Sequence, residues 1–147
     1  MKVIAKNKKA SFEYFLLESF TAGIVLTGTE IKSIRAGKAS INEAYCMLIN
    51  DEIWIKNMHI AVYEHGTIYN HEPKRDRKLL LQKREIKKIR GKHVEKGIAI
   101  IPTVLYIADN GLAKIDIALA KGKKLYDKRE TIKTKDINRD NDRNLKY

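Results

Sequence analysis

The stretch "IAIIPTVLYIADNGLAKIDIALA", residues 98–120, decides the fold of this chain. Asn110 and Gly111 near its centre favour a tight turn, because both residues tolerate the positive φ angles that short hairpin loops require. After the turn, apolar residues alternate with polar or small ones from Ile115 to Leu119. A period of two is typical of a strand that buries one face and exposes the other. The stretch therefore predicts a β-hairpin, with strands at 98–107 and 112–120.

The segments before this hairpin predict further short strands. Residues 11–26 are rich in aromatic and branched side chains and favour two short strands around Gly23. Residues 44–60 form two apolar runs divided by Asn50-Asp51-Glu52, which indicates a second hairpin. Residues 61–78 show no clear period and hold dense charge, so we expect a loop there.

Two segments have helical character. Thr27 and Glu30 have the spacing of a capping box, in which each side chain accepts a hydrogen bond from the other residue's backbone amide. Gly37 is a suitable C-terminal end for that helix. From about Gln82 to Lys96, apolar residues recur at helical spacing while Lys and Arg fill most other positions. We therefore expect a capped helix near residue 30 and an amphipathic helix near residue 90.

Together these elements predict a mainly β fold with added helices. About six short, mostly antiparallel strands with two to three helices hide their edges best in a small closed β-barrel. The alternating pattern stops after Ala120, so we expect a barrel domain over residues 1–120 and a separate tail over 121–147. The tail is too polar to repay the entropy of ordering and is expected to be disordered when free.

The basic residues are concentrated in two blocks of a chain with a formal charge of +12. Residues 74–92 hold ten Lys or Arg against two acidic residues, and residues 121–147 hold ten against five. The rest of the chain is nearly neutral. Segregated cations beside a neutral body favour binding to a polyanion, with nucleic acid as the first candidate. Solvated charged helices and contact with an acidic membrane surface are the alternatives.

Membrane-spanning and secreted classes do not fit the sequence. The longest apolar run, residues 44–49, is too short to cross a bilayer. The N-terminus has no hydrophobic stretch of the kind found in secretory signals. Cys46 is the only cysteine, so no internal disulfide can form, and a reducing cytosol is the simplest setting.

No catalytic or metal-binding motif stands out. The glycines are too dispersed for a phosphate-binding loop, and the four histidines lack metal-ligand spacing, so we expect no metal, no cofactor and no enzymatic activity. The strongest enzymatic alternative is a ribonuclease that uses His65 and His71 as acid and base, oriented by adjacent glutamates. A general single-stranded-RNA or ribosomal protein built on the same barrel is the other alternative.

Three stretches resemble the SsrA-binding protein (small protein B) family: "GIVLTGTEIKSIRAGKASI" at 23–41, "EPKRDRKLLLQKREI" at 72–86 and "AKGKKLYDKRE" at 120–130. The similarity runs from about Ile4 to Arg139. It implies an oligonucleotide-binding-like barrel, not an enzyme, that binds the tRNA-like domain of transfer-messenger RNA (tmRNA, or SsrA RNA). It further implies delivery of this RNA, alanylated and carried by elongation factor Tu, to stalled ribosomes in the cytoplasm. There the unfinished peptide is tagged, a process called trans-translation. We expect a monomer.

The resemblance also implies an RNA-binding face. Matched residue by residue, this face comprises Asn7, Lys8, Glu30, Lys32, Arg35, Lys38, Arg77, Lys78, Leu80 and Gln82. The sequence supports part of it independently, since Lys32 and Arg35 share one helical face and can reach phosphate. For Glu30 the alternative is that it only caps its helix. For Leu80 the alternatives are a core position or packing on an exposed base or ribose.

The tail has a helical pattern of charge. At 100° per residue, six cations fall within an arc of about 100°: Lys121, Lys124, Lys128, Lys135, Arg139 and Arg143. We therefore hypothesise that the tail folds into a helix when a groove lined with phosphates neutralises this stripe. The resemblance identifies that groove as the vacant message channel, beside the decoding centre, of a stalled ribosome. The tail residues expected to contact the ribosome are Lys121, Gly122, Lys123, Lys124, Tyr126, Asp127, Lys128 and Arg129.

Two residues depart from the family pattern. Thr21 stands where many members of the family carry glutamate, and Tyr126 stands where many carry histidine. A tyrosine can still stack on a base, as a histidine does, but it cannot carry the positive charge of an imidazolium ion.

Overall fold

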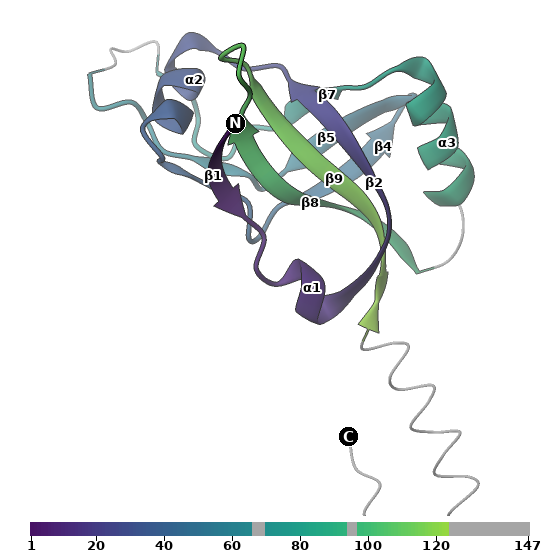
Figure 1. The fold of residues 1–147 in the computed structure, drawn as a ribbon. Helices are drawn as coiled ribbons and strands as arrows, with labels where there is room; N and C mark the ends of the chain where they lie inside the picture. Colours follow the sequence, from purple (N-terminus) through teal and green to yellow (C-terminus); the bar gives the residue numbers. More distant parts are fainter. Residues whose placement is uncertain (66–69, 94–96, 124–147) are drawn as a thin grey trace, which may run out of the picture.

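The stretch 98–120 forms the predicted hairpin in a computed structural model of the protein, which describes residues 1–65, 70–93 and 97–123 (Figure 1). Its strands are β8 (Ile98–Ile107) and β9 (Ala113–Gly122). Gly111 in the connecting turn has a φ of +84°, a value that favours glycine. β9 extends past Ala120, the predicted end of the barrel domain, because Lys121 continues to pair with the neighbouring strand.

The two faces of β9 pack in two separate clusters of buried residues. Ile115, Ile117 and Leu119 lie in the main core and are fully buried. Ala120, on the opposite face, packs in a smaller cluster with Ala10. The small residues of the alternation are therefore buried as well, because a short N-terminal helix covers that side of the strand.

Six antiparallel strands form a closed ring. The other strands of the protein are β1 (Lys2–Lys6), β2 (Tyr14–Ile24), β3 (Ala39–Ser40), β4 (Tyr45–Ile49), β5 (Glu52–Lys56), β6 (His59–Ile60) and β7 (Arg77–Leu80). The order around the ring is β8-β4-β5-β7-β2-β9, and β9 pairs with β8 to complete it. β1 joins β8 outside the ring, while β3 and β6 make a separate two-stranded sheet. The predicted closed antiparallel sheet is confirmed.

Three helices lie around the ring in the described part of the chain: α1 (Ala10–Glu13), α2 (Gly28–Arg35) and α3 (Lys83–His93). Figure 1 shows α2 and α3 on opposite sides of the strands. Each is attached by a fully buried isoleucine, Ile34 in α2 and Ile89 in α3. Both helices were predicted, although 94–96, the expected end of the second one, lie outside the described residues.

The hairpin predicted within residues 44–60 is also confirmed. β4 and β5 pair in register from Tyr45 opposite Lys56 to Ile49 opposite Glu52. Asn50 and Asp51 have φ angles of +49° and +61°, so both central residues of the turn adopt the left-handed region. Asn and Asp tolerate this region better than most residues do.

Two sequence-based expectations were wrong, and some short strands were not anticipated. Residues 14–24 form one continuous strand, since Gly23 pairs with both Leu80 and Lys114 and does not interrupt it. The segment before that strand is a helical turn, α1. The segment 61–78, expected to be a loop, ends in the first residues of β7, and β1 was not anticipated at all. The strands that were not predicted, β1, β7 and the two-residue β3, are short, and their pairing partners lie far away in sequence.

Candidate nucleic-acid interface

Helix α2 begins with the predicted capping box. The Thr27 hydroxyl accepts a hydrogen bond from the Glu30 backbone amide at 3.4 Å, and the Glu30 carboxylate accepts one from the Thr27 amide at 2.8 Å. The helix ends near Gly37, whose φ is +77°. This geometry fixes the direction of α2 and leaves Lys32 and Arg35 exposed on its outer side.

The carboxylate of Glu30 is buried between two arginines. Its side chain has no exposed area, and it pairs with Arg75 at 2.6 Å and, by a short contact, with the Nε of Arg77. Burial alone would raise the pKa of Glu30, but hydrogen bonds from Arg75, the Thr27 amide and Arg77 outweigh it and lower this pKa to about 2. Glu30 is therefore an ionised group beneath the surface, and it is not accessible to a partner in this conformation.

Arg77 is the second buried charge. Its guanidinium donates to three backbone carbonyls as well as to Glu30, at 2.7 Å to Met58, 3.1 Å to Pro73 and 3.4 Å to Glu72. Burial lowers the pKa of Arg77, whereas the Glu30 carboxylate opposes that shift. Of the residues expected on the RNA-binding face, Arg77 and Glu30 thus lie underneath it. Neither burial was visible in the sequence.

The expected cations of α2 and of the segment just after it are exposed. Lys32 lies over the ring of Tyr63, with its Nζ 5.4 Å from the ring centroid. Arg35 donates to the Gly111 carbonyl at 3.1 Å, which ties α2 to the turn between β8 and β9. Lys38 pairs with Glu64 at the surface. All three side chains can reach a ligand without breaking a buried contact.

The expected residues of β7 and its C-terminal end lie at the surface. Lys78 pairs with Glu52 at 2.5 Å and is partly exposed. Leu80 is 53% exposed, so the alternative of a core position for this residue is wrong. Gln82 is exposed just before α3, where its backbone amide donates to Glu85 at 3.1 Å.

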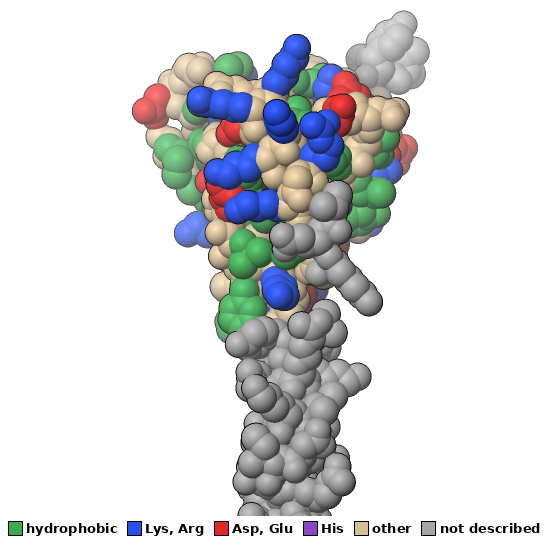
Figure 2. Space-filling view, turned by 90° about the vertical axis from the view of Figure 1, so that its right-hand side faces the viewer, with side chains coloured by type: hydrophobic (Ala, Val, Ile, Leu, Met, Phe, Trp, Pro, Cys, Tyr) green, Lys and Arg blue, Asp and Glu red, His purple; other side chains and the backbone are tan. Residues whose placement is uncertain are grey.

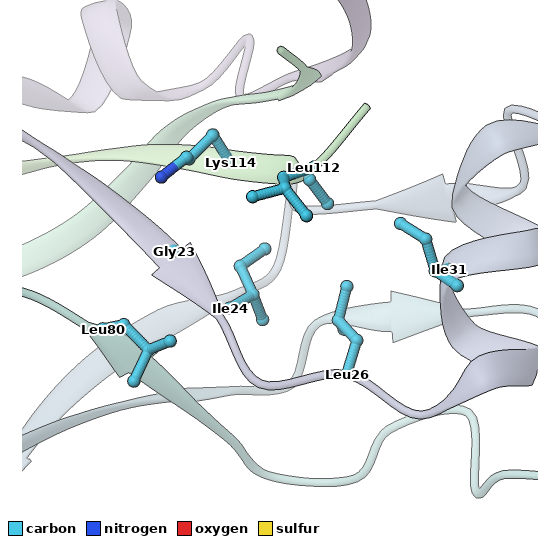
Figure 3. A pocket seen from close by; sticks show the side chains of 8 residues that line it. Gly23, Ile24, Leu26, Ile31, Leu80, Leu112 and Lys114 are labelled. Carbon is cyan, nitrogen blue, oxygen red and sulfur yellow. The ribbon is translucent and has the colours of Figure 1, made fainter. Parts of the chain in front are cut away.

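An apolar groove of about 370 Å³ joins β7 to α2 (Figure 3). Its lining side chains come from β2, the connection from β2 to α2, α2, β7, the turn before β9 and β9: Ile24, Leu26, Ile31, Leu80, Leu112 and Lys114. Gly23 also lines the groove, and a Cβ at this position would lie 3.4 Å from the Cβ of Leu80, in van der Waals contact with it. The groove combines exposed leucines with one cation on its rim, and the cations of α2 lie on the adjoining helix.

Asn7 lies away from the apolar groove, in a different hollow, and Lys8 is its neighbour in sequence. Asn7 donates to the Pro102 carbonyl at 3.0 Å and accepts from the Lys9 amide at 3.2 Å, so its side chain fixes the connection from β1 to α1. It lines a polar hollow together with Glu43 and Tyr45. Lys8 is exposed. The structure therefore does not place Asn7 among the residues of the apolar groove.

Three of the expected ribosome-contacting residues fall within the described chain. Lys121 and Gly122 pair with β2 as part of β9. Lys123 donates to the Ser11 carbonyl at 2.6 Å, and its Nζ lies 5.1 Å from the centroid of the Phe15 ring. The others lie outside the described residues: Lys124, Tyr126, Asp127, Lys128 and Arg129.

Helix α3 carries a second basic surface, which the family-based list of residues missed. Figure 2 shows Lys and Arg side chains gathered on the side of the molecule where α3 lies. Lys83, Arg84 and Lys87 are exposed and form no ion pair with any other described residue. Lys83 and Lys87 line a groove together with Ile86, Arg90 and Asp51. The dense charge of residues 74–92 was the signal for this surface.

The two histidines of the ribonuclease alternative have different environments. His71 is buried, with Nδ1 2.9 Å from the Thr29 hydroxyl and Nε2 2.9 Å from the Ile60 carbonyl. His65 is exposed, and its ring packs edge-on against Tyr63. Both ring nitrogens of His71 are thus engaged by the protein. Within the described residues, no three His, Cys, Asp or Glu side chains are grouped as a metal site would require, and no helix is long and apolar enough to cross a membrane.

Thr21, one of the two residues that depart from the family pattern, is exposed on β2. Its hydroxyl donates to the carboxylate of Asp116 on β9 at 2.9 Å. The side chain thus links two strands near the groove, and the position itself is accessible.

Comparison with known proteins gives consistent matches over most of the chain. A family model described as SmpB protein matches residues 4–147. An SsrA-binding protein of Cytophaga hutchinsonii is 62% identical over 135 residues, covering 92% of this chain and 88% of that protein. One of Parabacteroides distasonis is 55% identical over 141 residues, covering 96% and 92%. A solved structure described as "tmRNA-SmpB: a journey to the center of the bacterial ribosome" has a TM-score of 0.68 and 41% identity, covering 80% of this chain and 82% of that one.

Proposed function

We propose, from the premise that this chain belongs to the SmpB family, that it binds tmRNA and acts with it on the ribosome in trans-translation. The curated relatives are SsrA-binding proteins, and the related solved structure concerns tmRNA, SmpB and the bacterial ribosome. Because these matches cover most of the chain, the function is proposed for the whole protein and not for one segment.

One observation of the structure supports the proposed position of the RNA on the protein. Exposed cations on α2 and β7, which are far apart in sequence, adjoin a single groove with exposed leucines. Contacts to phosphates position an RNA on a protein. Apolar contacts to an unstacked base or a ribose allow a protein to recognise a single-stranded loop of a folded RNA. Lys32, Arg35, Lys38 and Lys78 would supply the first kind of contact. Leu80 would supply the second, with Gln82 beside it.

Asn7 and Lys8 extend this proposal to the N-terminal side of the protein. Lys8 is exposed and can reach a phosphate directly. Asn7 already uses its side-chain amide and carbonyl within the protein, so it would contribute mainly by holding the backbone of this connection. Replacing Lys8 with Gln should therefore weaken RNA binding and reduce its salt dependence.

A competition experiment tests the choice of ligand. Purified protein is titrated with a transcript of the tRNA-like domain of tmRNA, and then with an unstructured RNA of equal length. We expect clear preference for the tRNA-like transcript. Equal affinity for both would support the alternative of a general single-stranded-RNA or ribosomal protein.

The groove itself can be tested by filling it. Gly23→Val places a branched side chain beside Leu80, and Ser19→Val is a matched control on the exposed face of the same strand. Both changes suit a strand, since valine has high β propensity. We expect Gly23→Val to weaken RNA binding and Ser19→Val to leave it unchanged. Equal affinities for the two variants would remove the groove from the binding site.

The tail is proposed to contact the ribosome and to become helical in the vacant message channel. The proposal concerns Lys121, Gly122, Lys123, Lys124, Tyr126, Asp127, Lys128 and Arg129. Since β9 and the contact from Lys123 to Ser11 extend past Ala120, a clean truncation ends after Lys123. It should retain affinity for the tRNA-like transcript and lose peptide tagging. Loss of RNA binding would contradict this division of roles.

We further propose a cytoplasmic monomer that meets elongation factor Tu only through alanylated tmRNA, and that is not an enzyme. The ribonuclease alternative receives no support from His71, because both of its ring nitrogens are engaged within the protein. Incubation with labelled RNA decides the matter. Cleavage that His65→Ala abolishes would favour the ribonuclease.

A further inference from the structure

We infer that Glu30, Arg75 and Arg77 form an ionic clamp, and that Arg77 and Glu30 are positioning residues for RNA binding that do not touch the RNA. This inference rests on the proposed function. It also assigns these two residues a role different from the family-based expectation, which placed both on the RNA-binding face. Their burial, their hydrogen bonds and their position between two exposed elements carry the argument.

The guanidinium of Arg77 has little capacity left for a phosphate. An arginine offers five N–H donors in a fixed plane. Here Nε binds Glu30, Nη1 donates to Met58, and Nη2 donates to Pro73 and Glu72. The side chain has no exposed area. To reach RNA it would have to give up its hydrogen bonds to the buried Glu30 carboxylate and to three backbone carbonyls, which is costly in a protein interior.

The carboxylate of Glu30 joins three parts of the chain. One oxygen accepts from the Thr27 amide at 2.8 Å and from Arg75 at 2.6 Å, while the other accepts from Arg77. These partners belong to the start of α2, the loop before β7 and the first residue of β7. A single buried group therefore sets the distance between α2 and β7.

A second contact ties the same loop to the same helix. The buried ring of His71 lies between the Thr29 hydroxyl on α2 and the Ile60 carbonyl on β6, at 2.9 Å from each. Arg75 also donates to the Val25 carbonyl at 3.3 Å, just before α2. The loop of residues 70–76 is thus held at both of its ends.

The elements held by the clamp carry the exposed residues of the proposed interface. Lys78 and Leu80 follow Arg77 directly on β7, and Lys32 lies one half-turn after Glu30 on α2. Contacts to RNA from two elements add up only if their spacing is fixed before binding, because ordering them during binding costs free energy. Loosening the clamp should therefore weaken RNA binding without removing a contact.

Salt dependence separates a positioning residue from a contacting one. Loss of one phosphate contact lowers the slope of log affinity against log salt by about 1. We compare Arg77→Lys, which retains the charge but loses the planar fork, with Lys78→Gln, which removes an exposed cation on the same strand. Each protein is measured with the tRNA-like transcript at several salt concentrations, at a temperature where circular dichroism shows it fully folded.

We expect Arg77→Lys to bind RNA at least about tenfold more weakly than the unmodified protein, because it displaces several residues that contact the RNA. The slope of log affinity against log salt should be unchanged, because no phosphate contact is lost. Lys78→Gln should bind slightly more weakly, with a reduced slope. Unchanged affinity of Arg77→Lys would overturn the inference, because the clamp would then serve stability alone. A third variant, Arg77→Gln, removes the charge. If Arg77→Lys bound as tightly as the unmodified protein while Arg77→Gln showed a lower salt slope, Arg77 would contact phosphate and the inference would also be overturned.

A second variant covers the case in which Arg77→Lys does not fold. Glu30→Gln retains the shape of the side chain and an oxygen that can accept from the Thr27 amide, but it loses the charge. It should lower RNA affinity with an unchanged salt slope, and unchanged affinity would count against the clamp. The proposed function is tested separately with the unmodified protein. If the unmodified protein shows no preference for the tRNA-like transcript, the proposed function fails. The salt slopes of the variants, measured with any RNA that binds, still test the clamp.

Discussion

The basic block of residues 74–92 divides into two regions that use the same residue types in opposite ways. In the first, Arg75 and Arg77 converge on the buried Glu30. In the second, α3 presents Lys83, Arg84 and Lys87 to solvent. The cations of the first region therefore stabilise the fold, whereas those exposed on α3 can bind an anionic partner. Burial of a single carboxylate makes the difference.

The ion pairs of α3 emphasise this contrast. Lys88 and Lys92 both pair with Glu18, at 2.5 and 3.1 Å, and their hydrogen bonds lower the pKa of that carboxyl. Arg90 pairs with Asp51 at 2.5 Å. The Lys and Arg side chains of these pairs are about half exposed, so water and salt screen the interactions. The clamp is shielded from such screening because its carboxylate has no exposed area.

Salt should produce the largest difference between the two regions. If exposed cations neutralise six to ten phosphates, RNA affinity falls about 10³–10⁵-fold between 50 and 200 mM salt. The free energy of unfolding should change little over the same range, since the buried clamp is poorly screened. Binding titrations and urea denaturation at both salt concentrations provide the comparison. A salt-insensitive complex would argue against recognition dominated by phosphate.

Removal of a clamp arginine should produce the next largest effect. Arg77→Met removes one arginine partner of the buried Glu30 carboxylate and the hydrogen bonds that the guanidinium donates to three carbonyls. Breaking a buried ion pair in this way costs about 3–5 kcal/mol of unfolding free energy. Lys87→Met, the matched change on α3, should stay within about 0.5 kcal/mol. Urea denaturation measures both, and equal losses would remove the distinction between the regions.

Acid should weaken the clamp over a defined pH range. The folded-state pKa of Glu30, about 2, lies below its ordinary value of 4.5, so the folded state favours the ionised carboxylate. Its stabilisation is complete above about pH 4.5 and is lost as the pH falls toward 2, amounting to ~3 kcal/mol. Unfolding free energies measured across this range should fall for the unmodified protein. The decline should be clearly shallower in Glu30→Gln, and an identical decline would contradict the assignment.

An exposed ion pair of α3 should give the smallest effect. Arg90→Gln removes the contact with Asp51 but leaves no buried group unpaired. The expected loss of unfolding free energy is below about 1 kcal/mol, and it should shrink further at high salt. Denaturation at two salt concentrations checks both statements. If Arg90→Gln lowered the free energy of unfolding as much as Arg77→Met does, the exposure of an ion pair would not explain the difference between the two regions.

Local sequence patterns predicted the elements whose causes are local. The hairpin turn at Asn110-Gly111, the capping box of Thr27 and Glu30, and the isoleucine spacing of α3 each depend on residues close together in the chain. They were found because turn geometry and helix periodicity act over a few residues. β7 and β1 were missed because each is short and is stabilised by distant partners, such as Ile53 opposite Leu79.

The candidate site was predicted less completely than the fold. The exposed cations of α2 and the exposed Leu80 lie where the family resemblance implied an accessible face. The burial of Glu30 and Arg77 could not be predicted, because an acidic residue that caps a helix has the same local sequence whether or not two arginines approach it from residues 75–77. Only the fold brings those arginines to it.

The most direct test of the central claim is to identify the RNA that the protein carries in cells. Full-length protein is recovered from its own cells under mild conditions, and the bound RNA is sequenced, with a Lys32→Gln, Lys38→Gln, Lys78→Gln variant recovered in parallel. Our account predicts one dominant species, tmRNA, with the unmodified protein and a strong depletion of it with the variant. A broad mixture of RNAs without enrichment of tmRNA would contradict the account.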